Sequence, residues 1–128
     1  MSVTAIMSTA GERFAHAIAA QDTAALRAVL ADHVDFEALT PGRLWTASSP
    51  AEVVDDIVLG PWFAAGRRIV KLSSVTTADV ADCRHVGYQL VVQRDGADHV
   101  VEQHAFYTAR EGKIDWIRIV CSGYRAIA

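Results

Sequence analysis

The fold is decided by residues 83–124, which read CRHVGYQLVVQRDGADHVVEQHAFYTAREGKIDWIRIVCSGY. Two Gly turns, Asp95-Gly96 and Glu111-Gly112, divide this stretch into three runs rich in Val, Ile and Tyr. Such dipeptides between strand-like runs are typical of two-residue hairpin loops. The stretch therefore predicts antiparallel strands in series at 83–94, 99–110 and 113–124, and a similar run at 68–78 predicts a fourth.

Three helices are predicted in the first half of the chain. Apolar residues recur at helical spacing within 9–20, and Asp22 is a suitable N-cap for a second helix that ends before residue 32. Ser49-Pro50-Ala51-Glu52 has the pattern of a capping box with Pro at the first helical position. This pattern predicts a third helix, which stops at Gly60-Pro61.

Residues 33–39 alternate between polar and apolar side chains, with Val34, Phe36 and Ala38 on one face. The alternation predicts a strand, and residues 44–46 predict a short extended piece. Helices that precede and interrupt a long meander of strands are typical of an α+β layer design. The predicted fold is a cone-shaped α+β barrel: a curved antiparallel sheet with three helices packed on its concave face.

Composition indicates a single globular domain over residues 1–128, with 52% hydrophobic and 21% charged residues. The formal net charge is -3 and both signs are scattered, which argues against a nucleic-acid partner. Cys83 and Cys121 lack a metal or redox spacing, as expected of a reducing compartment. No apolar run reaches the length of a membrane span. We therefore expect a cytoplasmic protein with no membrane partner.

Glu102, Gln103 and His104 lie in the middle of a predicted strand, where ionisable side chains are costly unless they are paired or line a pocket. If Glu111-Gly112 is a two-residue loop, Arg110 faces Lys113, and counting outward pairs the two strands. The pairs are Phe106 with Ile117, His104 with Ile119, and Glu102 with Cys121. Because Ile117, Ile119 and Cys121 are apolar, this register predicts that Glu102 and His104 point inward.

Two registers remain open at this point. A slip of one residue exchanges the faces and would turn Val101, Gln103, Ala105 and Tyr107 inward. At the Asp95-Gly96 turn, a two-residue loop pairs Tyr88 with Gln103, whereas a three-residue loop pairs Tyr88 with His104.

The order of elements resembles the nuclear transport factor 2-like superfamily. The resemblance covers nearly the whole chain and rests on the two helices, the strand ending in Glu37-Ala38, the Pro-Gly turn, the capped third helix and the meander through Glu111-Gly112-Lys113-Ile114. It lies closest to the SnoaL-like proteins, which include polyketide cyclases, and to ketosteroid isomerases, limonene epoxide hydrolases and scytalone dehydratases. It implies a cystatin-like cone with a ligand cavity.

The resemblance to ketosteroid isomerase places Phe14, Ala38 and His104 where that family has an oxyanion-binding tyrosine, a general-base aspartate and a protonated aspartate. Two of these three groups are missing, so steroid isomerisation by that route is not expected. The Asp-Arg-Asp arrangement of limonene epoxide hydrolases is also absent, since Ile119 and Cys121 occupy the predicted inward positions of the last strand.

Two functions fit these observations. The first is a cofactor-free lyase, isomerase or cyclase acting on a hydrophobic carbonyl-containing small molecule. His104 would transfer the proton beside Glu102, and Tyr88 or Gln103 would polarise the carbonyl. The predicted ligand-lining residues are Phe14, Ile18, Phe36, Ala38, Trp62, Phe106, Ile117, Ile119 and Cys121. The second is a non-catalytic ligand-binding or dimeric scaffold module, in which His104 is a structural histidine.

The histidines show no metal-ligand spacing, so neither a metal nor another cofactor is expected. For association, Trp116 and Tyr107 fall on the face that the predicted register turns outward. They predict a homodimer through the outer face of the sheet.

Overall fold

The computed structural model describes residues 9–64 and 66–127. Its helices are α2 (Ala10–Ala19), α3 (Thr23–Ala28), α4 (Pro50–Val53) and the π-helix η1 (Val54–Trp62). Its strands are β1 (Leu30–Thr40), β2 (Arg43–Ala47), β3 (Arg68–Val80), β4 (Cys83–Arg94), β5 (Ala97–Arg110), β6 (Lys113–Cys121) and β7 (Arg125–Ala126).

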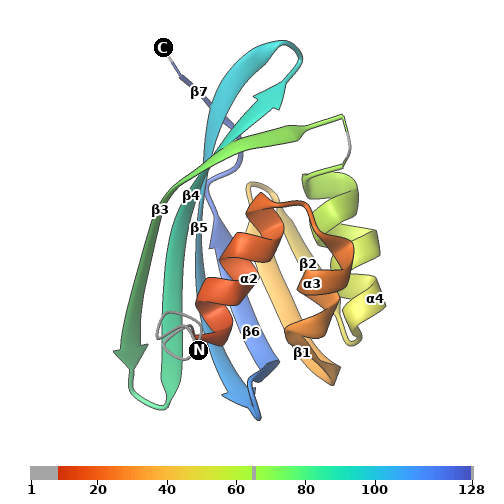
Figure 1. Ribbon diagram of the computed structural model, residues 1–128, viewed down its shortest axis with the longest axis vertical. Helices are drawn as coiled ribbons and strands as arrows, with labels where there is room; N and C mark the ends of the chain where they lie inside the picture. The colour runs from red at the N-terminus through yellow and green to blue at the C-terminus, as the bar shows by residue number, and fades with distance from the viewer. Residues whose placement is uncertain (1–8, 65, 128) are drawn as a thin grey trace, which may run out of the picture.

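The strands form one curved sheet in the order β2-β1-β6-β5-β4-β3, with β7 on β5, and the helices lie on its concave side (Figure 1). This confirms the predicted α+β cone. The sheet is mixed rather than fully antiparallel, because β1 and β6 run parallel while the other neighbouring strands are antiparallel. Among the described residues, no helix combines the length and the apolar character that a membrane crossing requires.

The helices begin where the caps predict. Asp22 accepts a hydrogen bond from the backbone N–H of Ala25 at 3.1 Å, and Ser49 accepts one from Glu52 at 3.3 Å. The third helix continues as η1 to Trp62, slightly beyond its predicted end. Gly60 permits this tight turn, since a Cβ there would lie 2.4 Å from the carbonyl oxygen of Asp55. Trp62, the last residue of the π-helix, is thereby placed on the inner side of the sheet.

Both predicted Gly turns are two-residue loops, because Arg94 pairs with Ala97 and Arg110 pairs with Lys113. Both residues of each turn have positive φ, as in turns whose twist matches that of the flanking strands. The first turn places Tyr88 opposite Gln103. This settles one of the two open registers in favour of the two-residue loop.

A β-bulge in β6 changes the second register. Ala109 pairs with Ile114 but Thr108 pairs with Trp116, so Asp115 is an extra residue in β6. The hydroxyl of Thr108 donates to Asp115 Oδ1 at 2.6 Å and holds the bulge. The extra residue allows Ile114 and Ile117 to be buried together although they are three apart in the strand.

Beyond the bulge, the faces of β5 are exchanged relative to the predicted pairing. Gln103, Ala105 and Tyr107 pair with Cys121, Ile119 and Ile117, and all three side chains of β5 are buried. Glu102, His104 and Phe106 lie on the outer, convex face. The prediction that these three side chains point inward is wrong, because the predicted register contained no bulge.

The outer face carries exposed apolar residues at its β2 side. Leu44 pairs with Leu39 and Leu39 with Val120, and each of these side chains is exposed. Trp116 also lies on this face, but Tyr107 does not: it is buried, and its hydroxyl accepts a hydrogen bond from Gly11 N at 2.9 Å. The argument for dimerisation therefore loses Tyr107, and the homodimer stays a prediction for sedimentation to test.

Candidate functional site

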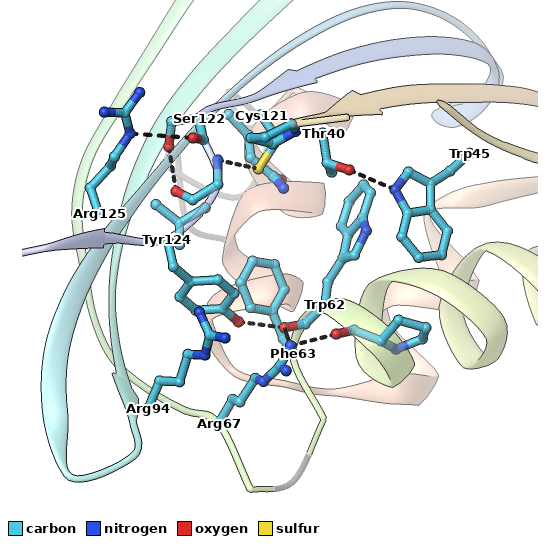
Figure 2. Close-up of a pocket in the computed structure, with 15 residues that line it drawn as sticks. Thr40, Trp45, Trp62, Phe63, Arg67, Arg94, Cys121, Ser122, Tyr124 and Arg125 are labelled. Carbon is cyan, nitrogen blue, oxygen red and sulfur yellow. Dashed lines mark hydrogen bonds between the residues drawn. The ribbon is translucent and has the colours of Figure 1, made fainter. Parts of the chain in front are cut away.

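A cavity of about 590 Å³ opens where β6 ends, a size within the usual range for small-molecule sites (Figure 2). Its walls come from the end of η1, the turn between β1 and β2, the inner side of β5, and residues 121–125. Gly123, with a φ of 74°, turns the chain after β6 so that Tyr124 folds back over the cavity.

Aromatic rings form one side of the cavity. Trp62 meets Trp45 edge to face at 6.0 Å between ring centroids, and Phe63 at 6.4 Å. Phe63 in turn meets Tyr124 at 6.3 Å. The indole N–H of Trp45 donates to Thr40 Oγ1 at 2.8 Å, and the hydroxyl of Tyr124 donates to the carbonyl oxygen of Trp62. These contacts fix an aromatic wall suited to an apolar, preferably cyclic ligand.

Two of the residues that line the cavity each carry a buried polar atom without a hydrogen-bond partner among the described residues: Trp62 Nε1 and Gln103 Nε2. Gln103 is fully buried, and its other amide atom, Oε1, accepts a hydrogen bond from the Tyr88 hydroxyl at 2.6 Å. That bond sets the amide orientation, because the buried hydroxyl needs an acceptor and only Oε1 provides one. The Gln103 Nε2 group is thereby left as a donor.

Burial raises the pKa of the Tyr88 hydroxyl well above its usual value, with a further contribution from Cys121. The hydroxyl therefore stays protonated at any ordinary pH and remains a donor to Gln103. Unpaired buried donors cost roughly 1–3 kcal/mol each, and a ligand oxygen within reach would recover part of that cost. The arrangement thus favours a ligand with a hydrogen-bond acceptor.

Three arginines, Arg67, Arg94 and Arg125, stand at the mouth of the cavity. Arg94 and Arg67 approach the ring of Tyr124, at 4.8 and 5.4 Å from its centroid (Figure 2). Burial raises the pKa of the Tyr124 hydroxyl, while these two arginines act in the opposite direction. Among the described residues that line the cavity there is no Asp, Glu or His.

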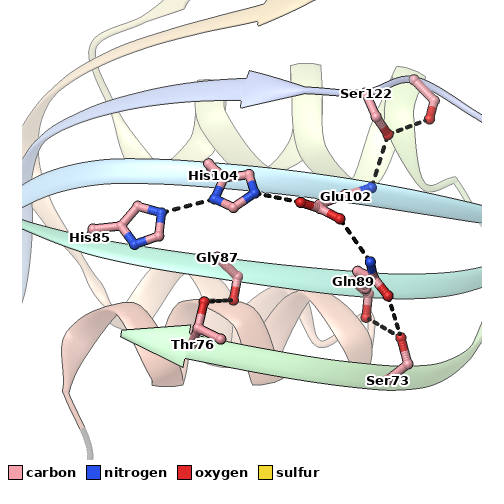
Figure 3. A network of polar contacts seen from close by, with 9 residues as sticks. Ser73, Thr76, His85, Gly87, Gln89, Glu102, His104 and Ser122 are labelled. Carbon is pink, nitrogen blue, oxygen red and sulfur yellow. Dashed lines mark hydrogen bonds and ion pairs between the residues drawn. The ribbon is translucent and has the colours of Figure 1, made fainter. Parts of the chain in front are cut away.

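The predicted catalytic pair lies on the opposite face of the sheet (Figure 3). His104 Nε2 is 2.6 Å from Glu102 Oε2, and His104 Nδ1 is 2.9 Å from His85 Nε2. Gln89 donates to the second oxygen of Glu102 at 2.7 Å. The imidazole of His104 lies next to Gly87, where a Cβ would be 2.8 Å from the ring. Since Glu102 and His104 are about two-fifths exposed, they form a half-solvated surface network.

Of the other predicted site residues, Trp62 and Cys121 line the cavity. Tyr88 points inward but contacts the cavity only through Gln103. Phe106 lies on the outer face beside His85, with ring centroids 5.0 Å apart. The remaining six are core residues that do not line the cavity, because the helices pack against them and fill that part of the cone: Phe14, Ile18, Phe36, Ala38, Ile117 and Ile119.

The cavity residues not predicted from the sequence include Tyr124, Arg67, Arg94 and Arg125. The sequence predicts Tyr124 within the last strand, but β6 ends at Cys121. The Ser122-Gly123 pair was the available signal for a turn there. In the described part of the chain, His, Cys, Asp and Glu side chains do not gather in a group of three that could hold a metal.

The outer network predicts how stability depends on pH. Burial, and then the neighbouring His104, lowers the pKa of His85 below its ordinary 6.5. Hydrogen bonds from Gln89 and then from His104 lower the pKa of Glu102 below its ordinary 4.5. Both shifts favour the deprotonated group in the folded state, so the unfolded chain takes up these protons first and stability falls as the pH drops.

We expect the free energy of unfolding to decrease below pH 6.5 through His85 and below pH 4.5 through Glu102. Urea denaturation at a series of pH values measures this. The free energy of unfolding should depend less on pH near 6.5 in His85→Asn and less on pH near 4.5 in Glu102→Gln.

His104→Ala should leave ligand binding in the cavity unchanged. Loss of that binding in His104→Ala would contradict the assignment of His104 to the outer face.

Comparison with known proteins identifies the fold. No protein-family model matches the sequence, and no curated protein matches it at a significant level. Solved structures do match. A candidate isomerase from Bacillus subtilis is similar over 88% of this chain and 84% of its own, with a TM-score of 0.70 and 14% identity.

An NTF2-like protein from Burkholderia thailandensis is similar over 91% of this chain and 92% of its own, with a TM-score of 0.63 and 20% identity. A limonene epoxide hydrolase-like enzyme from M. tuberculosis is similar over 88% and 80%, with a TM-score of 0.65 and 12% identity. The chain therefore has the nuclear transport factor 2-like fold that the order of its elements predicted. At these identities the likeness concerns the fold alone.

Proposed function

We propose that this protein binds a hydrophobic small molecule with a carbonyl group in the cavity, and that Gln103 Nε2 and Trp62 Nε1 donate hydrogen bonds to its oxygen. The observation that carries the proposal is the pair of buried, unpartnered donors on two residues that line a cavity with an aromatic wall. Carbonyl oxygen is the complementary group, since it accepts two hydrogen bonds and adds no charge to an apolar site.

Binding is favoured over proton transfer at this site. A general acid or base must lie within hydrogen-bond reach of the reacting atom. His104 and Glu102 lie on the other face of the sheet, and the described lining contains neither a carboxylate nor an imidazole. The second of the two sequence-based hypotheses, a ligand-binding module, is therefore the one proposed. Names of structural neighbours such as isomerase and epoxide hydrolase are compatible with a small-molecule cavity in this fold.

The two cysteines provide a test within one molecule. Cys121 lines the cavity, whereas Cys83 begins β4 and lies outside the cavity, and both are free thiols of intermediate exposure. The probe is benzoylpropionamide, a neutral aryl ketone, and its control is phenylbutyramide, which lacks the ketone oxygen. At about ten times its dissociation constant, the ketone should slow alkylation of Cys121 by roughly tenfold. Cys83 should react at an unchanged rate.

Peptide mass spectrometry after timed iodoacetamide treatment measures both rates. We expect the control compound to need roughly three- to tenfold higher concentration for equal protection, because the two compounds share the amide group and differ only in the ketone oxygen that would accept from the donors. Equal protection of Cys121 by both compounds would contradict the role of the ketone oxygen. Unchanged alkylation of Cys121 at a ketone concentration that saturates a thermal shift would contradict binding in this cavity.

A further inference from the structure

The charge of the cavity mouth is opposite to that of the whole chain. The formal net charge of the protein is -3, yet the charged side chains of the described lining are three arginines and no acidic residue. The cavity is bounded by low-dielectric aromatic walls, which strengthen the field of such a cluster at the entrance. A positive mouth above an apolar interior is a feature of sites for amphipathic anions.

Contacts with the backbone and with Tyr124 position the arginines. Arg67 Nη1 donates to the carbonyl oxygens of Pro61 at 2.6 Å and Trp62 at 3.1 Å. The same Trp62 carbonyl accepts from Tyr124, whose ring lies 4.8 Å from the Arg94 guanidinium carbon. The two guanidinium groups are thus held around one aromatic ring, next to the wall that Phe63 and Trp62 form.

Arg94 is available to a ligand. Its ionic contact among the described residues is with Asp95, at 3.8 Å, and that carboxylate is 91% exposed. An ion pair this long with so exposed a partner is weak and screened by salt. A ligand carboxylate could replace it with a paired, shorter hydrogen-bonded contact, since a guanidinium presents two parallel N–H groups.

From this geometry we infer that the ligand is an amphipathic anion: a hydrophobic keto acid whose carboxylate lies at Arg94 and Arg67 and whose ketone lies deeper, toward Gln103 and Trp62. The inference rests on the proposed function for the position of the ketone. It adds the ligand's charge and its direction in the cavity. The aromatic wall of the cavity would contact the apolar body of the acid.

Four related compounds test the role of the carboxylate and the role of the ketone separately. They are benzoylpropionate, its neutral amide benzoylpropionamide, phenylbutyrate and phenylbutyramide. The keto acid should bind roughly five- to tenfold tighter than the keto amide in titration calorimetry at low salt. That advantage should shrink between about 0.01 M and about 1 M salt, because an exposed ion pair is screened. The same charge advantage should separate phenylbutyrate from phenylbutyramide.

Arg94→Gln should reduce the preference for the acids to about twofold or less, while leaving the affinity of benzoylpropionamide unchanged. Arg110→Gln, a substitution on the distant β5–β6 hairpin, is the matched control and should retain the full preference.

A keto acid and keto amide of equal affinity would overturn the anion inference and leave the carbonyl proposal standing. Acids that bind tightly with or without the ketone would support the anion inference and contradict the carbonyl proposal. Failure of all four compounds to bind at millimolar concentration would overturn the inference.

Discussion

Deletion of Asp115 is expected to lower the free energy of unfolding by at least about 2–3 kcal/mol, because it removes the bulge that sets the faces of β5 and β6. Without the extra residue, the side chains of β6 on one side of the bulge must exchange faces of the sheet. If the side chains at the hairpin end exchange faces, Ile114 leaves the core. If those in the remainder of β6 exchange faces, Ile117 and Ile119 become exposed and the charge of Arg118 is forced inward. Each of the three isoleucines is now at most 2% exposed.

The matched control for this deletion is Asp115→Ala, which keeps the residue count but removes the hydrogen bond from Thr108. Its expected cost is about 1 kcal/mol, the usual value for one partly exposed hydrogen bond. Urea denaturation followed by circular dichroism compares the two variants. A deletion variant no less stable than Asp115→Ala would mean that the register of β6 does not depend on the bulge.

The second large effect is expected at Gln103. Gln103→Met preserves approximate shape but removes both polar atoms of the amide, leaving the buried Tyr88 hydroxyl without its acceptor. We expect a loss of roughly 1–3 kcal/mol in stability, together with a loss of the affinity that the carbonyl contributes. Tyr88→Phe should be milder for binding, because it keeps the amide donor and removes only the bond that orients it.

The double variant Tyr88→Phe/Gln103→Met tests whether the two residues act together. Since it removes both partners of the hydrogen bond, its stability should recover above that of Gln103→Met, although ligand affinity should stay low. Chemical denaturation and calorimetry with benzoylpropionamide measure the two quantities separately. Additive losses of stability in the double variant would contradict the buried Tyr88–Gln103 bond.

Much of the fold was predictable because it depends on local signals. The two Gly turns, the caps at Asp22 and Ser49, and the alternation of β1 each act over a few residues, and each appears where it was predicted. The order of elements then predicted the nuclear transport factor 2-like fold, which the solved structures share.

The orientation of the site was not predicted, because one bulge reverses every side chain beyond it. Two signals for that bulge were present in the sequence. Ile114 and Ile117 are three apart, so they cannot share a face of a regular strand. In β5, the apolar residues Val101, Ala105 and Tyr107 share a face with Gln103, whereas Glu102 and His104 share the other face. The arginines at the cavity mouth come from separate segments, so their proximity is a tertiary property without a local signal.

The most direct test of the carbonyl proposal is to follow the side-chain N–H resonances of Trp62 and Gln103 by nitrogen–proton correlation spectroscopy during titration with benzoylpropionamide. Trp116, on the outer face, serves as the reference indole in the same spectrum. We predict that the Trp62 indole and Gln103 amide signals move downfield and saturate together, as hydrogen-bonded protons do, while Trp116 stays fixed. Saturable binding that leaves the Trp62 and Gln103 signals unmoved would contradict the proposal.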